Sequence, residues 1–231
     1  MASNPECRSK GLTIASVCSI ALGLCVGVAA QVPVHLEPRH PVVFESDLLR
    51  VLNVNIEAGD STLDHVHAYD IAVVCVSGCE IRTRILGRDW GDWGSRSAGQ
   101  VTVNANAGDP SAHRHQAGRS HYHVISVENL RQSGWSQDAP ATGLAPKLVN
   151  ETRAFQIYDV RLGAGNVEAD HVHTHPVVAI LVSGDAVVDG KRQPSKGGGR
   201  SSEWAVIPAG TPHRAANRGT TEAHVIEIEV R

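Results

Sequence analysis

Two stretches of the sequence are near copies of each other. Residues 59–78 read GDSTLDHVHAYDIAVVCVSG, and residues 165–184 read GNVEADHVHTHPVVAILVSG. Both contain Asp-His-Val-His and Val-Ser-Gly at the same positions. A repeated frame of this length predicts two units of similar structure within one chain.

Each copy carries two histidines separated by one residue, His65 and His67 in the first and His171 and His173 in the second. On a β-strand, residues two apart point to the same face, about 6.5 Å apart along the strand. Each pair can therefore turn two imidazoles toward one point, and neutral imidazole suits zinc, copper, iron and nickel. A single pair is more often exposed on an edge strand, but repetition of the whole frame favours a ligand site.

A third histidine follows each pair. Residues 204–217 read WAVIPAGTPHRAAN, which predicts a strand, a turn at Pro-x-Gly and then His213. The first copy has the related AGDPSAHR at residues 107–114, with two extra residues before its His-Arg. We therefore predict His213 and His113 as third ligands, with His115 as second choice in the first unit. Three more histidines occupy the closing strands, where we expect them to face outward or to support the ligands: His121, His123 and His224.

The composition favours β structure. Glycine and proline are frequent (22 and 11 residues), aromatic residues make up only 4% of the chain, and short Val/Ile runs alternate with turn signals. Helical periodicity is missing after residue 31, so we predict an all-β protein. The net charge of −3 offers no basic patch, so nucleic acid is not an expected partner.

The first thirty residues differ from the rest. Arg8 and Lys10 precede a largely apolar stretch, residues 11–30, which ends in small residues at Ala30. This pattern is typical of a signal peptide and predicts cleavage after Ala30, hence a secreted or periplasmic protein without stable membrane contact. The alternative is an uncleaved membrane anchor formed by residues 11–30.

The mature part would retain two cysteines, Cys75 and Cys79, which imply no disulfide framework. We expect Cys75 to be a small buried residue; the alternative is a Cys75–Cys79 bridge, which would need the Ser77-Gly78 turn to bring the two cysteines together. Pro-rich residues 31–41 suggest an extended arm over the surface, in which His35 and His40 are solvated or structural. The predicted organisation is a signal peptide (residues 1–30), an arm (31–41), a first domain (42–130), a linker (131–146) and a second domain (147–231).

The motifs of the second repeat resemble the two signatures of the cupin superfamily. They are G-x5-H-x-H followed by an apolar strand ending in glycine, and P-x-G-x2-H-x3-N at residues 208–217. The first repeat has the opening motif in full and the closing motif in altered form. The resemblance covers nearly all of residues 42–231 and implies a bicupin, with two tandem jelly-roll β-barrels. It further implies one divalent transition metal (Fe, or Zn, Mn, Ni or Cu) per barrel, and some cupins pair as homodimers.

One feature departs from that resemblance. Most metal-binding cupins supply a glutamate four or five residues after the second histidine, and here those positions are apolar: Ile71, Ala72, Val177 and Val178. Asp70 comes one residue early and faces away on a regular strand, unless a bulge turns it inward. His175 shares the parity of His171 and His173, so we predict it as a fourth ligand or an acid–base catalyst.

A three-histidine site resembles that of the iron dioxygenases among cupins. The first hypothesis is therefore a secreted or periplasmic metal-dependent oxidoreductase or dioxygenase that acts on a small molecule, with Arg153, Arg161 and Arg214 as candidates for binding a carboxylate. The stretched closing motif suggests the first barrel as the one more prone to have lost activity. The alternative is a non-catalytic protein that binds a metal or a small molecule such as a sugar.

Overall fold

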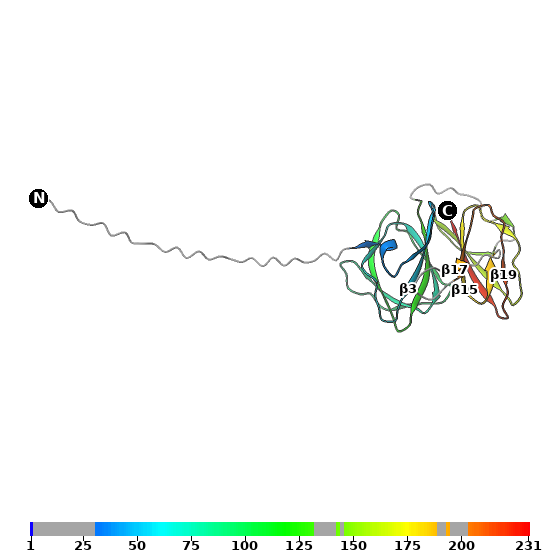
Figure 1. Cartoon of the computed structure of the whole chain (residues 1–231), viewed down its shortest axis with the longest axis horizontal. Coiled ribbons are helices and arrows are strands. Elements are labelled where there is room, and N and C mark those ends of the chain that lie inside the picture. The colour runs from blue at the N-terminus through cyan, green and yellow to red at the C-terminus, as the bar shows by residue number, and fades with distance from the viewer. Residues whose placement is uncertain (2–30, 132–141, 144–145, 189–192, 195–202) are drawn as a thin grey trace.

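The computed structural model describes Met1 and residues 31–131, 142–143, 146–188, 193–194 and 203–231. These residues form β-strands and one short 3-10 turn (Figure 1). No helix among them is long and apolar enough to cross a membrane. The expected signal peptide and most of the expected linker lie outside the described residues.

The first barrel consists of two five-stranded sheets, of strand order β1-β4-β9-β6-β7 and β2-β3-β10-β5-β8. Its elements are β1 (Val32–Pro33), η1 (Val34–Leu36), β2 (Val42–Glu45), β3 (Leu49–Ile56), β4 (His65–His67), β5 (Asp70–Ser77), β6 (Cys79–Ile85), β7 (Gly94–Arg96), β8 (Val101–Asn104), β9 (Ser111–Ala117) and β10 (Tyr122–Asn129).

The second barrel is built around one six-stranded sheet, of strand order β12-β13-β20-β15-β18-β17, with two small sheets, β11-β14 and β16-β19. Its strands are β11 (Thr142–Gly143), β12 (Lys147–Glu151), β13 (Phe155–Leu162), β14 (His171–Val172), β15 (Val177–Ser183), β16 (Ala186–Val188), β17 (Gln193–Pro194), β18 (Glu203–Ile207), β19 (Ala215–Asn217) and β20 (Ala223–Val230). The all-β prediction, with two barrel-like sets of sheets, is confirmed.

The same three-strand unit recurs in both barrels. In the first, β10 lies between β3 and β5, and in the second, β20 lies between β13 and β15. Glu128 of β10 pairs with Ile71, and Glu229 of β20 pairs with Val177 at the corresponding place. This register defines which residues of the two barrels are equivalent.

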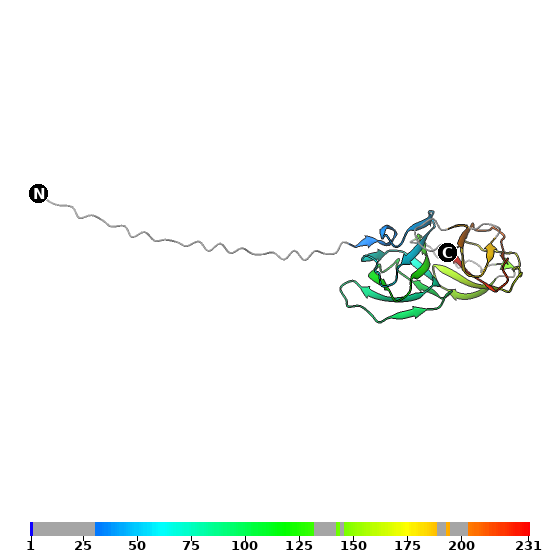
Figure 2. The ribbon, with the colours of Figure 1, turned by 60° about the horizontal axis from the view of Figure 1, so that its bottom comes forward.

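Alternating residues of these central strands face two different cores. One set fills the inside of each barrel, including Val124 in the first and Val225 in the second. The other set lies between the two barrels, which stand side by side in Figures 1 and 2, and forms one shared cluster that includes Ile125 and Ile226. Burial of apolar surface stabilises a packed contact by about 25 cal/mol per Å². The shared cluster therefore holds the two barrels together.

The segment between residues 31 and 41 differs from the expected surface arm. Val34 belongs to the apolar core inside the first barrel, and β1 pairs with β4 in parallel. Glu37 and His40 are buried, and Glu37 Oε2 lies 2.6 Å from His40 Nδ1. The segment therefore forms part of the first barrel, because its apolar and polar side chains both have buried partners.

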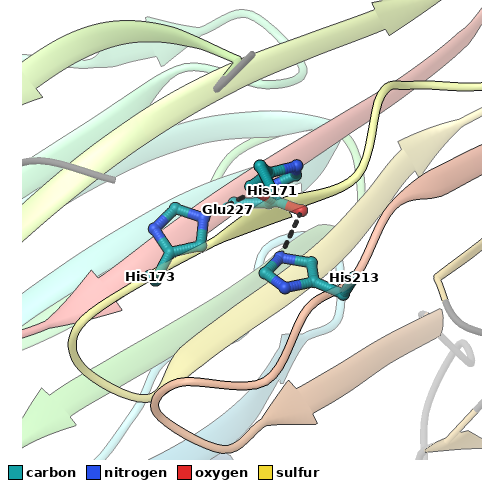
Figure 3. A group of neighbouring side chains, drawn as sticks. All are labelled: His171, His173, His213 and Glu227. Atoms are coloured by element: carbon teal, nitrogen blue, oxygen red, sulfur yellow. Dashed lines mark hydrogen bonds and ion pairs between the residues drawn. The ribbon is translucent and has the colours of Figure 1, made fainter. Parts of the chain in front are cut away.

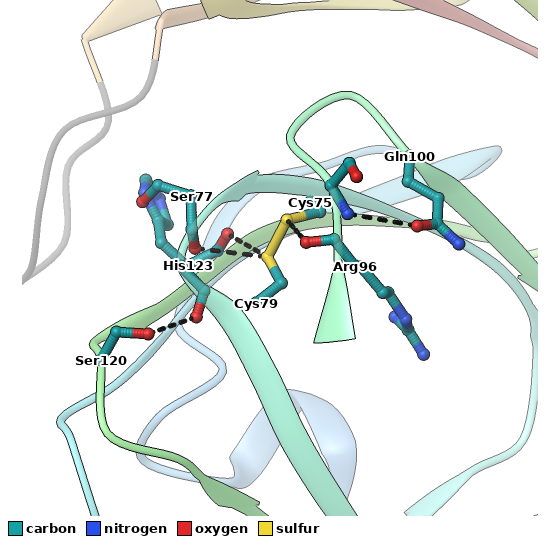
Figure 4. Close-up of a disulfide and its surroundings, with 9 residues drawn as sticks. Cys75, Ser77, Cys79, Arg96, Gln100, Ser120 and His123 are labelled. Atoms are coloured by element: carbon teal, nitrogen blue, oxygen red, sulfur yellow. Dashed lines mark hydrogen bonds between the residues drawn. A yellow bond between two sulfur atoms is a disulfide. The ribbon is translucent and has the colours of Figure 1, made fainter. Parts of the chain in front are cut away.

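Cys75 is buried as expected, but it forms the alternative disulfide with Cys79, so the expectation that it is unpaired was wrong (Figure 4). The chain reverses between β5 and β6 at Gly78, which has a φ of +60°. A Cβ at Gly78 would lie 2.3 Å from the carbonyl oxygen of His121, so only glycine fits this turn. The tight reversal brings the two Cα atoms to 6.1 Å, which a disulfide can span.

Candidate metal sites

The second barrel gathers four potential ligands, which we call the second cluster: His171, His173, His213 and Glu227. One ligand atom of each lies within 4.8 Å of the others, and all four residues are buried. His171 and His213 are neighbours because their backbones exchange hydrogen bonds of 3.1 and 3.0 Å. Figure 3 shows the Glu227 carboxylate between the rings of His171 and His213.

The backbone orients two of these rings. His171 Nδ1 lies 3.2 Å from the carbonyl oxygen of Ala169, and His213 Nδ1 lies 3.0 Å from that of Thr211. Because Nδ1 donates to a carbonyl in each case, Nε2 points inward, at 3.2 Å (His171) and 3.6 Å (His213) from Glu227 oxygens. Metal-ligating histidines typically donate the other ring N–H to such an acceptor, as Nδ1 of both rings does here.

The charges of the second cluster balance one another. Burial opposes charge on His173, but its hydrogen bonds with Glu227 and Glu229 outweigh burial and raise its pKa to about 9. The pKa of His171 is also raised, since Glu227 outweighs the effect of burial. Conversely, burial would raise the pKa of Glu227, but hydrogen bonds from the histidines hold it well below its usual value. The cluster therefore holds protons when no cation is bound.

Glu227 was missed by the sequence prediction. It comes from the last strand, β20, where it shares inward parity with Val225 and Glu229. The signal was present as HVIEIEV, residues 224–230, in which two glutamates alternate with apolar residues on a closing strand. A buried acidic residue needs a partner, so this alternation was evidence for a site.

His175 is not brought into the second cluster. The predicted parity required a strand through residue 175, but β14 ends at Val172 and the chain bends before Pro176. The His175 backbone N–H and Nδ1 lie 3.0 and 3.2 Å from Glu229 Oε1, while Glu229 Oε2 lies 2.9 Å from His173 Nδ1. His175 therefore contacts the carboxylate that orients His173.

The first barrel brings together His65, His67 and His113, which we call the first cluster. Their potential ligand atoms lie within 4.8 Å of one another. His65 and His113 face each other across β4 and β9, with ring centroids 4.7 Å apart. His115, the second choice, lies beside the cluster, where its Nδ1 is 3.0 Å from the Thr83 hydroxyl.

The first cluster fits a cation. His65 Nε2, His67 Nδ1 and His113 Nε2 are buried without a hydrogen-bond partner among the described residues, an arrangement that costs free energy unless a ligand engages them. Burial is the largest cause that lowers their pKa values, to about 3 for His65, 2 for His67 and 4 for His113. The rings are thus neutral at physiological pH, and neutral imidazole is the ligating form.

Within the described part of the chain, no carboxylate enters the first cluster, and the strand register explains why. Ser126 pairs with Val73 of β5 in the first barrel, and Glu227 pairs with Ala179 of β15 at the equivalent place in the second. Ser126 is therefore the counterpart of Glu227. Glu128, the counterpart of Glu229, instead accepts a 2.7 Å hydrogen bond from Arg50. The first barrel therefore offers a metal three neutral nitrogens. The second barrel offers three nitrogens and one carboxylate.

A cavity of about 560 Å³ adjoins the first cluster. Its walls include His67, His113, His115 and Ser126, and His40 also reaches it. The volume is in the range of small-molecule sites. Ser126 is the counterpart of Glu227 but has a smaller side chain. The first cluster therefore has space for a ligand where Glu227 fills the second cluster.

The remaining singled-out residues lie away from both clusters. His123 and His224 face outward from their barrels but are buried between them, with Nε2 atoms 2.9 Å from Asn53 Oδ1 and 3.0 Å from Asp159 Oδ1. His121 lies 3.8 Å from Glu57. The arginines named as carboxylate candidates are exposed: Arg153, Arg161 and Arg214.

No protein-family model and no curated sequence matches the chain. Among solved structures, AerE from Microcystis aeruginosa is similar with a TM-score of 0.52 and 12% identity, over 84% of this chain and 98% of that one. Salicylate 1,2-dioxygenase from Pseudoaminobacter salicylatoxidans gives 0.51 and 11%, over 80% and 69%. Oxalate decarboxylase from Bacillus subtilis gives 0.50 and 11%, over 80% and 69%. At these identities the likeness concerns the fold, and the chain has the cupin fold that these dioxygenase and decarboxylase structures share.

Proposed function

We propose that this protein is a secreted or periplasmic metal-dependent enzyme of the oxidoreductase or dioxygenase type, with its working site at the first cluster. The observation that carries the proposal is the cavity beside His67 and His113. A divalent transition metal held there would supply a Lewis-acidic centre, which is redox-active if the metal is iron. Sequence patterns favoured the second barrel for activity, but the cavity and Ser126 favour the first.

The residues of the first barrel have distinct parts in this proposal. His65, His67 and His113 would hold the metal through the three ring nitrogens that lack partners. His40 and Ser126 line the cavity and can hydrogen-bond a substrate, and Glu37 fixes the ring of His40. Val54, Val73 and Val124 line part of the cavity, and such apolar side chains would strengthen polar interactions made beside them.

The second cluster would bind a metal in a structural role. Its four ligands are buried and include a carboxylate, so the ion would be closely surrounded. This closed arrangement resembles structural sites, whereas an open position is typical of catalytic ones. His175 is proposed to position His173 through Glu229 and not to transfer protons to substrate.

The export proposal has one supporting observation. The Cys75–Cys79 disulfide fits an oxidising compartment, where such bonds persist. The proposal is tested by N-terminal sequencing of protein recovered from the periplasm or medium, which should begin at Gln31. A full-length chain in the membrane fraction would instead support the anchor.

The alternative function is non-catalytic binding of a metal or small molecule. It is favoured by the second cluster, in which the Glu227 carboxylate lies 3.2, 3.4 and 3.6 Å from histidine ring nitrogens and so compensates their charge without a metal. The two functions are separated by oxygen uptake with iron(II) and a panel of phenolic, thiol and diketone substrates. Enzyme function predicts turnover that is lost in His67→Ala and retained in His171→Ala, whereas turnover lost only in His171→Ala contradicts the assignment to the first cluster.

A further inference from the structure

Arg96 lies on the inner face of the first barrel. It ends β7 and pairs with Cys79 of β6, and cross-strand partners point to the same face of a sheet. Cys79 belongs to the interior core, so the Arg96 side chain is directed into the barrel, where it lines the cavity beside His67 and His113. The Cys75–Cys79 disulfide lies beside this strand, with Cys75 Sγ 3.8 Å from the Arg96 carbonyl oxygen (Figure 4).

The charge of Arg96 has no acidic partner among the described residues, although it is partly buried. Three other arginines of this barrel do have one: Arg50 pairs with Glu128, and Arg84 and Arg114 pair with Asp64. Asp109 also lines the cavity, but it is exposed and forms no ion pair with Arg96. A partly desolvated cation of this kind is stabilised by an anionic ligand.

A second polar group lies near this charge. Tyr122 is buried at the cavity, and among the described residues no hydrogen bond engages its hydroxyl. Burial raises the pKa of Tyr122, and the nearby Arg96 charge partly opposes that rise. Part of the cavity wall is apolar and includes Val54, Val73 and Val124. The cavity thus combines a cationic end, a hydroxyl donor, an apolar wall and the first cluster.

We propose that this cavity binds a small organic carboxylate with an apolar body, whose charged end pairs with Arg96 and Tyr122. The guanidinium fork matches the two oxygens of a carboxylate, and the hydroxyl of Tyr122 donates a further hydrogen bond. The apolar body lies against the valine wall and reaches the first cluster. The inference rests on the proposed function for the role of the cluster, and it names the substrate class.

The test compares benzoate with benzamide, which has nearly the same shape without the charge. Binding is measured by ligand-observed NMR on the full mature protein, both metal-free and loaded with zinc. The wild type should bind benzoate more tightly than benzamide. In Arg96→Gln, benzoate affinity should fall at least about tenfold, because a charge-assisted hydrogen bond is lost, while benzamide affinity stays the same.

Two further variants and one control measurement complete the design. Tyr122→Phe should weaken benzoate binding by a smaller factor than Arg96→Gln. Arg88→Gln removes the same charge from an exposed turn outside the cavity and should leave binding unchanged. Zinc content should not change in Arg96→Gln, which shows that the first cluster remains folded.

The outcomes separate this inference from the proposed function. Equal benzoate affinity in wild type and Arg96→Gln overturns the inference, as does the lack of any preference for benzoate over benzamide. If zinc binds the first cluster but benzoate does not bind, the inference fails and the metal site stands. If benzoate binding depends on Arg96 but the first cluster takes up no metal, the proposed function fails and the anion site stands.

Discussion

Replacing Glu227 with glutamine tests whether the second cluster is a charge-balanced unit. Glu227 is fully buried and lies 3.2, 3.4 and 3.6 Å from ring nitrogens of His171, His173 and His213. Glutamine keeps the shape of the side chain but removes the charge that the histidines compensate. Removal of one partner of a buried ion pair typically costs about 3 to 5 kcal/mol. We therefore expect metal-free Glu227→Gln to lose about that much free energy of unfolding at pH 6.

The effect should depend on pH in a defined direction. The pKa of His173 is raised to about 9 in the folded protein from an ordinary value of 6.5. Stability that arises from a raised histidine pKa is fully present below pH 6.5 and is lost as the pH rises toward 9. The destabilisation by Glu227→Gln should therefore shrink between pH 6 and pH 9.5.

Urea unfolding followed by circular dichroism, after removal of metal with a chelator, measures this quantity. Glu222→Gln is the matched control, because it removes the same charge from an exposed residue just before β20 that pairs with Arg161 at the surface. Such a surface pair contributes at most about 1 kcal/mol. If Glu227→Gln costs no more than Glu222→Gln at pH 6, the reasoning about the cluster is refuted.

Three further predictions concern the first barrel. Ser126→Glu places a carboxylate where Glu227 stands in the second barrel, so turnover should be lost while zinc retention against a chelator improves; unchanged turnover would contradict the role of the cavity. Removing the disulfide with Cys75→Ser/Cys79→Ser opens a loop with a sequence separation of 4 and should lower the free energy of unfolding by about 2 kcal/mol, measured in urea; no change would show that the disulfide does not stabilise the fold. The histidines of the first cluster have lowered pKa values. The free energy of unfolding of the metal-free protein should therefore fall by up to about 1.4 kcal/mol per pH unit for each of them as the pH drops below 6.5. In urea unfolding, His67→Gln should make this fall with pH less steep.

The local patterns of the sequence predicted much of the fold. The alternation of a strand places His65 and His67 on one face, and the Pro-x-Gly turn sets the position of His213. Both depend on neighbours along the chain, and the structure brings the predicted histidines of each unit together. The duplication of the frame correctly indicated two similar barrels.

The features that were missed depend on contacts between distant segments. Glu227 reaches His171 because β20 lies beside β15 in the middle of the sheet, which the sequence alone does not specify. His175 was misplaced because a bend before Pro176 interrupts the parity of the strand. The position of Arg96 could not be predicted either, since it depends on the pairing of β7 with β6.

The central claim is that each barrel holds one metal ion through its histidine cluster. Elemental analysis of purified mature protein, compared with His67→Ala and His171→Ala, tests it most directly. The account predicts one metal ion per cluster in the wild type and the loss of one ion in each variant. Wild-type protein that takes up no transition metal, or variants that retain the full metal content, would contradict it.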